Sequence, residues 1–275
     1  MPTCKRCKQE FSSKQRLDYH MKRKNPCKII KMPVDDFIEE HEKLVGVLET
    51  AQGPGVKEEL QEQSSELKKQ LDKTFNVERG INLDLDKKTG NSTVILGSSK
   101  AGKSTLLMYL YNKYYRDLIT ILFSDNPQIN LYKDKKLIKS SYFIPQIIKE
   151  FHYINRKTNN KYDFACLLDD IVNEKEDEML RRLVLSFRNS NISSIVSIQS
   201  PTLLNKSNRS SVNNLIFFRF NTEEMIEQVI KFFLSSHLPG RMDEKIRLYK
   251  QLTADHQFIY LNPRENRMTV HKISI

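Results

Sequence analysis

Residues 93–110 read TVILGSSKAGKSTLLMYL: the apolar run Thr93–Leu96 leads into the eight-residue segment Gly97–Ser104, and a second largely apolar run, Thr105–Leu110, follows. The middle segment fits the pattern G-x-x-x-x-G-K-[ST] at every fixed position. The flanking runs predict a strand before it and a helix after it, which is the context that this pattern requires. The sequence therefore predicts a strand–loop–helix unit that binds a phosphate chain.

The residue types in this loop explain how it would hold phosphate. Glycines let the backbone fold so that successive N–H groups face one phosphate chain, and the helix that follows adds the positive end of its dipole. Lys103 would reach the β- and γ-phosphates, and the Ser104 hydroxyl would ligate Mg²⁺. We therefore expect ATP and Mg²⁺ as cofactors. The candidate nucleotide-binding residues are Gly97, Ser98, Ser99, Lys100, Ala101, Gly102, Lys103, Ser104 and Thr105.

Polar residues follow two further predicted strands. Asp169 and Asp170 come directly after the apolar run Phe164–Leu168, and Gln199 follows Ser194–Ile198. In open α/β sheets, ligands bind at the carboxyl ends of the strands. We expect Asp169 on the Mg²⁺ side of the site, Asp170 to orient or activate the attacking water, and Gln199 to sense the γ-phosphate or position water.

Apolar runs of strand length alternate with helical stretches after residue 77, which predicts an α/β fold: a mostly parallel sheet with helices on both faces. We predict the last two strands to form an antiparallel hairpin. The predicted strands are Thr93–Leu96, Leu118–Phe123, Phe164–Leu168, Ser194–Ile198, Leu215–Phe220, Phe258–Leu261 and Met268–Ile273. The predicted helices are Ser104–Tyr114, Phe143–Arg156, Asp177–Ser190 and Glu223–Leu234.

Charge divides the chain into three segments. Residues 1–33 carry a net charge of +8, residues 34–75 carry −6, and the remaining 200 residues carry +9 of the total of +11. A basic head and a basic body are typical of proteins with a polyanion partner, although a solvated basic surface gives the same count. We predict three domains: a zinc-binding segment at 1–31, a helical linker or hairpin at 32–76, and the α/β domain at 77–275.

Cysteines near the start of the chain have zinc-ligand spacing. Cys4 and Cys7 are followed by twelve residues and then His20, which matches C-x₂-C-x₁₂-H, with Phe11 and Leu17 at the small-core positions of a ββα finger. Cys27 lies further from His20 than is usual, and Pro26 would turn the chain back toward the metal. We predict a Zn²⁺ site of Cys4, Cys7, His20 and Cys27, the alternative being free thiols in a basic tail.

Composition excludes several classes of protein. With 39% hydrophobic and 29% charged residues the chain has enough apolar material for a packed core. No apolar run approaches the roughly 20 residues of a membrane span, and no apolar stretch follows the basic residues Lys5 and Arg6, so we expect neither a membrane span nor a secretory signal. Four cysteines in 275 residues make no disulfide framework, so we expect a reducing intracellular compartment.

These motifs together resemble the HerA/FtsK superfamily of P-loop ATPases, RecA-like enzymes that pump DNA. The turn, strand and Gln-x-Pro of Arg188–Pro201 and the strand before Arg219 resemble elements of that superfamily. The compact form over residues 77–275 is most similar to the genome-packaging ATPases of poxviruses and other large DNA viruses and virophages. Many superfamily members have Asp-Glu where this chain has Asp169 and Asp170.

The resemblance implies ATP hydrolysis coupled to translocation of double-stranded DNA. It also implies a ring, with a hexamer expected, in which an arginine of one subunit completes its neighbour's site; Arg188 is the first candidate and Arg219 the second. Capsid or other packaging proteins would be partners, and the host cytoplasm, a virus factory or the virion would be the location.

Two other functions remain open from the residues alone. A nucleotide or polynucleotide kinase would share the phosphate loop, but such kinases carry an Arg-rich lid that we do not find. A zinc-finger regulator that has kept an inactive nucleotide fold would bind DNA without hydrolysing ATP, and the intact Lys103, Ser104, Asp169 and Asp170 argue against it. The chain has no Leu-Ser-Gly-Gly signature of an ABC ATPase.

Overall fold

The computed structural model describes residues 77–79, 83, 90–125, 132–170, 183, 187–204, 209 and 211–272. All of them belong to Lys73–Ile275, the second of the two units into which the chain divides. The predicted zinc segment (1–31), the predicted helical linker (32–76) and most of the predicted helix Asp177–Ser190 lie outside the described residues.

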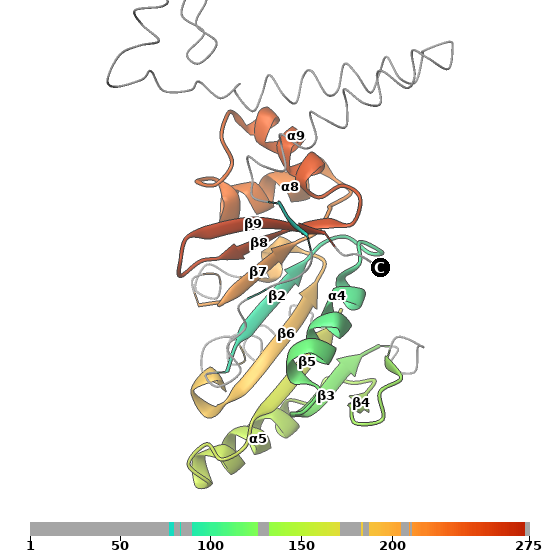
Figure 1. Ribbon diagram of the computed structural model, residues 1–275, viewed down its shortest axis with the longest axis vertical. Coiled ribbons are helices and arrows are strands. Elements are labelled where there is room, and N and C mark those ends of the chain that lie inside the picture. Colours follow the sequence, from blue (N-terminus) through green and yellow to red (C-terminus); the bar gives the residue numbers. More distant parts are fainter. Residues whose placement is uncertain are drawn as a thin grey trace, which may run out of the picture. The chain divides into compact units, whose positions relative to one another are not determined.

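A nine-stranded sheet organises this unit (Figure 1), with the strand order β1-β9-β8-β7-β2-β6-β5-β3-β4. The six strands from β7 to β4 are parallel to one another. β8 runs antiparallel to both β7 and β9, and β1 joins β9 in parallel. The predicted mostly parallel sheet and its terminal antiparallel hairpin are therefore confirmed.

The elements follow the predicted alternation, with boundaries shifted by a few residues. The strands are β1 (Val77–Arg79), β2 (Ser92–Leu96), β3 (Ile119–Ser124), β4 (Ile138–Ser140), β5 (Phe164–Asp169), β6 (Ile192–Ile198), β7 (Asn214–Phe217), β8 (Gln257–Asn262) and β9 (Arg267–Lys272). The helices are α4 (Lys103–Leu110), α5 (Pro145–Lys157), α8 (Glu223–Val229) and α9 (Met242–Leu252), with the short turns η1 (Tyr111–Tyr115), η4 (Phe187–Ser190), η5 (Pro201–Leu203) and η6 (Ile230–Leu234).

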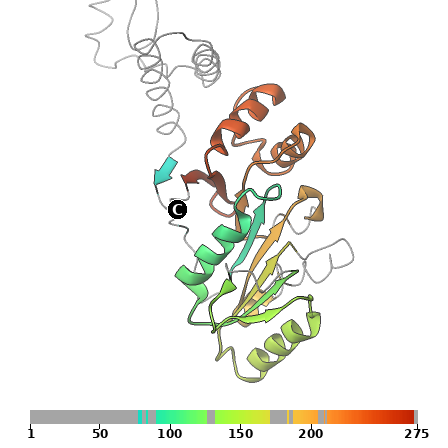
Figure 2. The ribbon, with the colours of Figure 1, turned by 90° about the vertical axis from the view of Figure 1, so that its right-hand side faces the viewer.

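The strand alternation places helices on both faces of the sheet, as predicted. Successive strand residues point to opposite faces. One face packs against α4 and contributes Ile95, Leu167 and Ile195 to a shared buried cluster. On the other face Phe164 stacks on Phe151 of α5, with ring centroids 4.2 Å apart. Figure 2 shows α4 and α5 on opposite sides of the strands.

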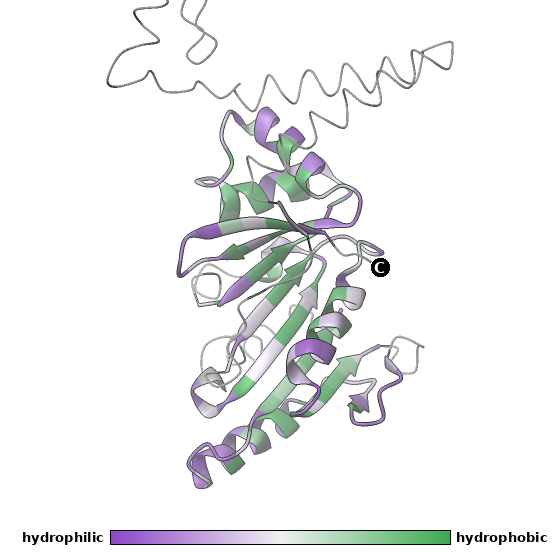
Figure 3. Cartoon of the chain, viewed as in Figure 1, coloured by the Kyte–Doolittle hydropathy of each residue, from purple (hydrophilic) through white to green (hydrophobic). Residues whose placement is uncertain are grey.

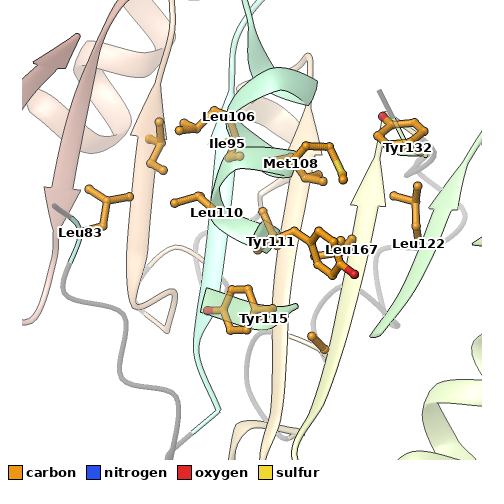
Figure 4. Close-up of a cluster of buried hydrophobic side chains, with 14 of the residues drawn as sticks. Leu83, Ile95, Leu106, Met108, Leu110, Tyr111, Tyr115, Leu122, Tyr132 and Leu167 are labelled. Atoms are coloured by element: carbon orange, nitrogen blue, oxygen red, sulfur yellow. The ribbon is translucent and has the colours of Figure 1, made fainter. Parts of the chain in front are cut away.

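The core lies between α4 and the central strands (Figure 4). Its buried members include six aromatic side chains from η1, β8, the residues after β7 and the segment before β4. These are Tyr111, Tyr115, Tyr132, Phe218, Phe258 and Tyr260, and all are fully or almost fully buried. Figure 3 shows hydrophobic residues along the central strands, whereas α5 and α9 mix hydrophobic and hydrophilic residues. The core therefore fixes α4, and with it the loop that precedes α4, on the sheet.

Candidate nucleotide site

The predicted phosphate loop leaves β2 at the carboxyl edge of the parallel sheet. Its first residues are tied to both neighbouring strands: Gly97 N–H donates to the Ile198 carbonyl (3.3 Å), and Ser98 N–H donates to the Arg219 carbonyl (3.1 Å). The Asn221 N–H in turn donates to the Ser98 hydroxyl (2.9 Å). The loop is therefore held between the ends of β6 and β7 before the chain enters α4.

Two left-handed residues shape the rest of the loop. Lys100 has φ 62° and Gly102 has φ 106°. Successive N–H groups in such a turn face inward and form an anion-binding concavity. Gly102 is the N-cap of α4, and no side-chain hydrogen bond caps this helix within the described part of the chain. The first-turn N–H groups and the positive end of the α4 dipole are thus directed at the loop, as phosphate binding requires.

Lys103 is a buried cation whose charge is balanced inside the site. Its side chain is only 3% exposed, Nζ donates to the Ser98 carbonyl (3.1 Å), and Nζ pairs with Asp170 Oδ2 (3.2 Å). A buried charge without such partners would cost several kcal/mol. The ion pair links the phosphate loop to the end of β5.

Asp169 is buried at the end of β5 and accepts hydrogen bonds on both carboxylate oxygens. The Ser197 hydroxyl donates to Oδ1 (2.7 Å), and the Tyr132 hydroxyl donates to Oδ2. Ser197 lies directly opposite Asp169 in the β5–β6 register. Burial, and then the hydrogen bond to Asp169, raise the pKa of Tyr132 far above its ordinary value. The phenol therefore keeps its proton and acts as a donor.

Asp170 stands in a different environment from its neighbour. Its backbone is left-handed, with φ 52°, a conformation that Asp adopts more readily than most residues other than glycine. Its N–H donates to the Ser197 hydroxyl (3.1 Å), and the Gln199 amide donates to Oδ2 (3.2 Å). The side chain is 31% exposed. Asp170 is thus held beside the loop with access to solvent.

The residues around Ser104 and Asp169 fit a Mg²⁺ ion. Ser104 follows Lys103 in the first turn of α4, and Asp169 precedes Asp170 at the end of β5. Because Lys103 and Asp170 form an ion pair, Ser104 and Asp169 belong to the same site. Magnesium takes oxygen ligands and is commonly held by one or two carboxylates, a hydroxyl and substrate phosphates. No cluster of three or more His, Cys, Asp or Glu side chains occurs among the described residues, and this kind of site needs none.

The two candidate arginines lie at opposite ends of the parallel strands. Arg188 belongs to η4, directly before β6, so its backbone lies at the amino ends of the strands, whereas the phosphate loop lies at their carboxyl ends. Arg219 is exposed and follows β7 beside the loop, where its carbonyl accepts from Ser98. The structure thus brings Lys103, Asp170 and Gln199 together with the loop and leaves Arg188 away from them. Cys4, Cys7, His20 and Cys27 lie outside the described residues.

Sequence reasoning missed Ser197 and Tyr132. A signal for Ser197 existed, because it is a polar residue two positions before Gln199 in a strand whose neighbours Val196 and Ile198 are apolar. The register of β5 and β6 was needed to place it against Asp169. Tyr132 carries no comparable signal, since it lies 37 residues before Asp169 and belongs to no motif.

The sequence matches no protein-family model and no curated protein. Solved structures share its fold. The genome-packaging NTPase B204 from Sulfolobus turreted icosahedral virus 2, in complex with sulfate, aligns at a TM-score of 0.51 and 14% identity, covering 68% of this chain and 98% of that chain. The DNA-packaging ATPase B204 from Sulfolobus turreted icosahedral virus aligns at a TM-score of 0.50 and 14% identity, covering 68% and 100%. The predicted α/β fold of the P-loop NTPase class is thereby confirmed for the described unit.

No helix among the described residues is both long enough and apolar enough to cross a membrane.

Proposed function

We propose that this protein is a Mg²⁺-dependent ATPase. The observation that carries the proposal is the convergence of Lys103, Asp170 and Gln199 on the phosphate loop, within 3.2 Å contacts of one another through Asp170. The loop pattern is accompanied here by a buried lysine and by a carboxylate pair at the end of β5, which is separated from β2 by β6 alone. ATP is the expected ligand, with its phosphates on the loop of residues 97–105.

The ion pair between Lys103 and Asp170 suggests how binding and hydrolysis are linked. A bound phosphate chain would compete with the Asp170 carboxylate for Lys103, because both are anions within reach of the same ammonium group. Asp170 would then be released to accept a proton from the attacking water, and Gln199 would position that water. Ser104 and Asp169 would hold Mg²⁺, which supplies charge neutralisation at the β- and γ-phosphates when bound.

DNA is the proposed partner and translocation the proposed work, with packaging of a viral genome as the specific role. The shared fold with packaging NTPases supports this proposal, as do the motif resemblance to the HerA/FtsK superfamily and the net charge of +9 on residues 76–275. A ring, with a hexamer expected, and capsid or other packaging proteins as partners belong to the same proposal.

ATP turnover measured with and without double-stranded DNA tests the function. We expect turnover that requires Mg²⁺ and rises when double-stranded DNA is added. Turnover that appears only with a small phosphate acceptor would instead identify a kinase. DNA binding without any turnover would identify the non-enzymatic regulator.

We also propose that residues 1–31 bind one Zn²⁺ ion. The spacing of Cys4, Cys7, His20 and Cys27 supports it. Purified full-length protein should contain one Zn²⁺ per chain, measured by elemental analysis, and a variant with Cys4→Ser and Cys7→Ser should contain none. Cys166→Ser is the matched control, because this buried thiol, whose pKa burial raises to about 12, is in the described core. Zinc-free wild-type protein would contradict the site.

A further inference from the structure

One tyrosine is bonded to a carboxylate that would hold the metal. Tyr132 is completely buried, and its phenol donates to Asp169 Oδ2. Figure 4 shows its ring beyond Leu122, toward the carboxyl ends of β3 and β5. A buried phenol normally satisfies its hydroxyl with one convenient backbone carbonyl, whereas this one is directed at a site carboxylate.

The direction of this hydrogen bond follows from the charge of the acceptor. The phenol has one proton, which goes to the charged acceptor, Asp169. The phenol is therefore the donor, and the other lone pair of Oδ2 stays available to a further partner.

The carboxylate of Asp169 is fixed by donors on its two sides. Ser197 holds Oδ1 at 2.7 Å, and Tyr132 holds Oδ2. Each oxygen of a carboxylate accepts about two hydrogen bonds, so one acceptor position on each remains for a metal-bound water. Two donors on opposite oxygens prevent rotation of the carboxylate about its terminal bond, which one donor alone would allow.

We propose that Tyr132 is a positioning residue of the metal–nucleotide site, which holds Asp169 in the orientation that binds Mg²⁺. The inference rests on the proposed ATPase function and adds to it a residue outside every sequence motif of the site. Tyr132 acts through Asp169.

The test uses full-length protein and a fluorescent ATP analogue. The dissociation constant of the analogue is measured in excess EDTA, and the Mg²⁺ concentration that gives half of the metal-dependent gain in affinity is then measured by titration. Tyr132→Phe removes a single oxygen. We expect it to raise the half-saturating Mg²⁺ concentration by roughly 10–100-fold, as loss of an outer hydrogen-bond partner does, with the affinity in EDTA unchanged.

Tyr115→Phe is the matched control, since Tyr115 is an equally buried phenol of the same core cluster and lies in η1, outside the motif positions of the site. It should leave the Mg²⁺ requirement unchanged. A second variant separates positioning from packing: in an Asp169→Asn background, Tyr132→Phe should add little, because its effect passes through that carboxylate.

Three results would overturn the inference. An unchanged Mg²⁺ requirement in Tyr132→Phe would show that the phenol has no role at the metal. A lowered requirement would show that it obstructs the metal. An equal loss of affinity in EDTA would show that it supports only the shape of the loop.

Wild-type protein that binds the analogue with Mg²⁺ but shows no DNA-stimulated turnover would contradict the translocase while leaving the role of Tyr132 intact. Wild-type protein that binds no analogue would contradict both.

Discussion

Two adjacent carboxylates have separate environments because one serine hydroxyl lies between them. Ser197 has a single proton, and its oxygen is 2.7 Å from Asp169 Oδ1 and 3.1 Å from Asp170 Oδ1. The shorter contact takes the proton, and the N–H of Asp170 donates to the same oxygen. Asp169 is therefore fixed and buried, whereas Asp170 is held by charge and remains partly exposed. This difference suits a metal-side carboxylate and a base, respectively.

Asp170→Asn should spare nucleotide binding and lose turnover. Asparagine keeps the shape but cannot accept a proton, so we expect the turnover number to fall by about 10²–10⁴-fold, as for loss of a general base. Affinity for ATP should not fall, since a phosphate chain no longer competes with a carboxylate for Lys103. Steady-state kinetics and nucleotide titration measure the two effects.

Asp134→Asn is the control for this variant, because Asp134 pairs with Arg116 (2.9 Å) and belongs to none of the site's motifs. Turnover at the wild-type rate in Asp170→Asn would show that another group accepts the proton.

The identity of the site residues could be predicted where a residue belongs to the loop pattern or follows a predicted strand. Lys103, Asp169, Asp170 and Gln199 each follow from the loop pattern or from a polar residue after an apolar run. The contacts that set their orientation could not be predicted, because they depend on register and on long-range packing. Tyr132 is the clearest case.

At the scale of elements, the loop fits because glycine stands where β2 approaches the residue after β7. A Cβ added to Gly97 would lie 2.7 Å from Phe218 Cβ. Phe218 cannot yield, since its N–H donates to the Leu96 carbonyl (2.8 Å) and its ring is buried against Phe258. The first glycine of the pattern is therefore required by packing, independently of any ligand.

Gly97→Ala should destabilise the folded domain as well as weaken nucleotide binding. Overpacking of this kind costs about 1–3 kcal/mol, and each kcal/mol lowers the melting temperature by about 2–4 °C for a domain of this size. Ser99→Ala, at an exposed loop position, should leave the melting temperature unchanged. Calorimetry of ligand-free protein measures both. An unchanged melting temperature in Gly97→Ala would show that the strands separate to admit the methyl group.

Among the described strands and α-helices, three were not predicted, and one strand was predicted too long. β1 and β4 have three residues each, too few for a periodic pattern to emerge. α9 buries only Leu248, Tyr249 and Leu252 among charged neighbours, so its apolar stripe is narrow. β7 was predicted to reach Phe220 but ends at Phe217, because the following residues leave the ladder with β8 and bond to the phosphate loop.

At the scale of the whole described unit, the fold class could be predicted and the strand order could not. Alternating strands and helices indicate a parallel sheet, but the order in which β2 lies between β6 and β7 is set by tertiary packing. That order matters for function, because only β6 separates β5 from β2. The end of β5 is therefore close enough to the phosphate loop for Asp170 to form an ion pair with Lys103.

Binding to double-stranded DNA should be tolerant of sequence and steeply dependent on salt. The basic residues 1–33 and 76–275 would contact phosphates, and each phosphate neutralised adds about 0.9 to the slope of log K against log salt concentration. Filter binding of several unrelated duplexes between low and moderate salt measures this. A sequence preference that survives high salt would favour a regulator over a translocase.

In a ring, each nucleotide site would be completed by an arginine of the neighbouring subunit. The backbone of Arg188 lies at the amino ends of the parallel strands, because η4 ends just before β6 begins. The phosphate loop adjoins the other end of β6. The Arg188 backbone is therefore far from the phosphate loop of its own subunit, which favours a role at the site of a neighbour. An arginine supplied in this way contributes roughly 10³–10⁵-fold to turnover.

Arg188→Ala protein should therefore bind ATP and hydrolyse it poorly, and Lys103→Ala protein should also be inactive. Mixing the two should restore part of the turnover, since mixed rings contain interfaces with an intact loop on one side and an intact Arg188 on the other.

Arg219→Ala, mixed with Lys103→Ala in the same way, is the matched comparison. Arg219 lies beside its own loop, so a loss of activity there should not be rescued in the same proportion. Turnover across mixing ratios, in rings shown to exchange subunits, decides between them. No recovery at any ratio with Arg188→Ala would place the action of Arg188 within its own subunit or limit it to a structural role, and recovery only with Arg219→Ala would exchange the two assignments.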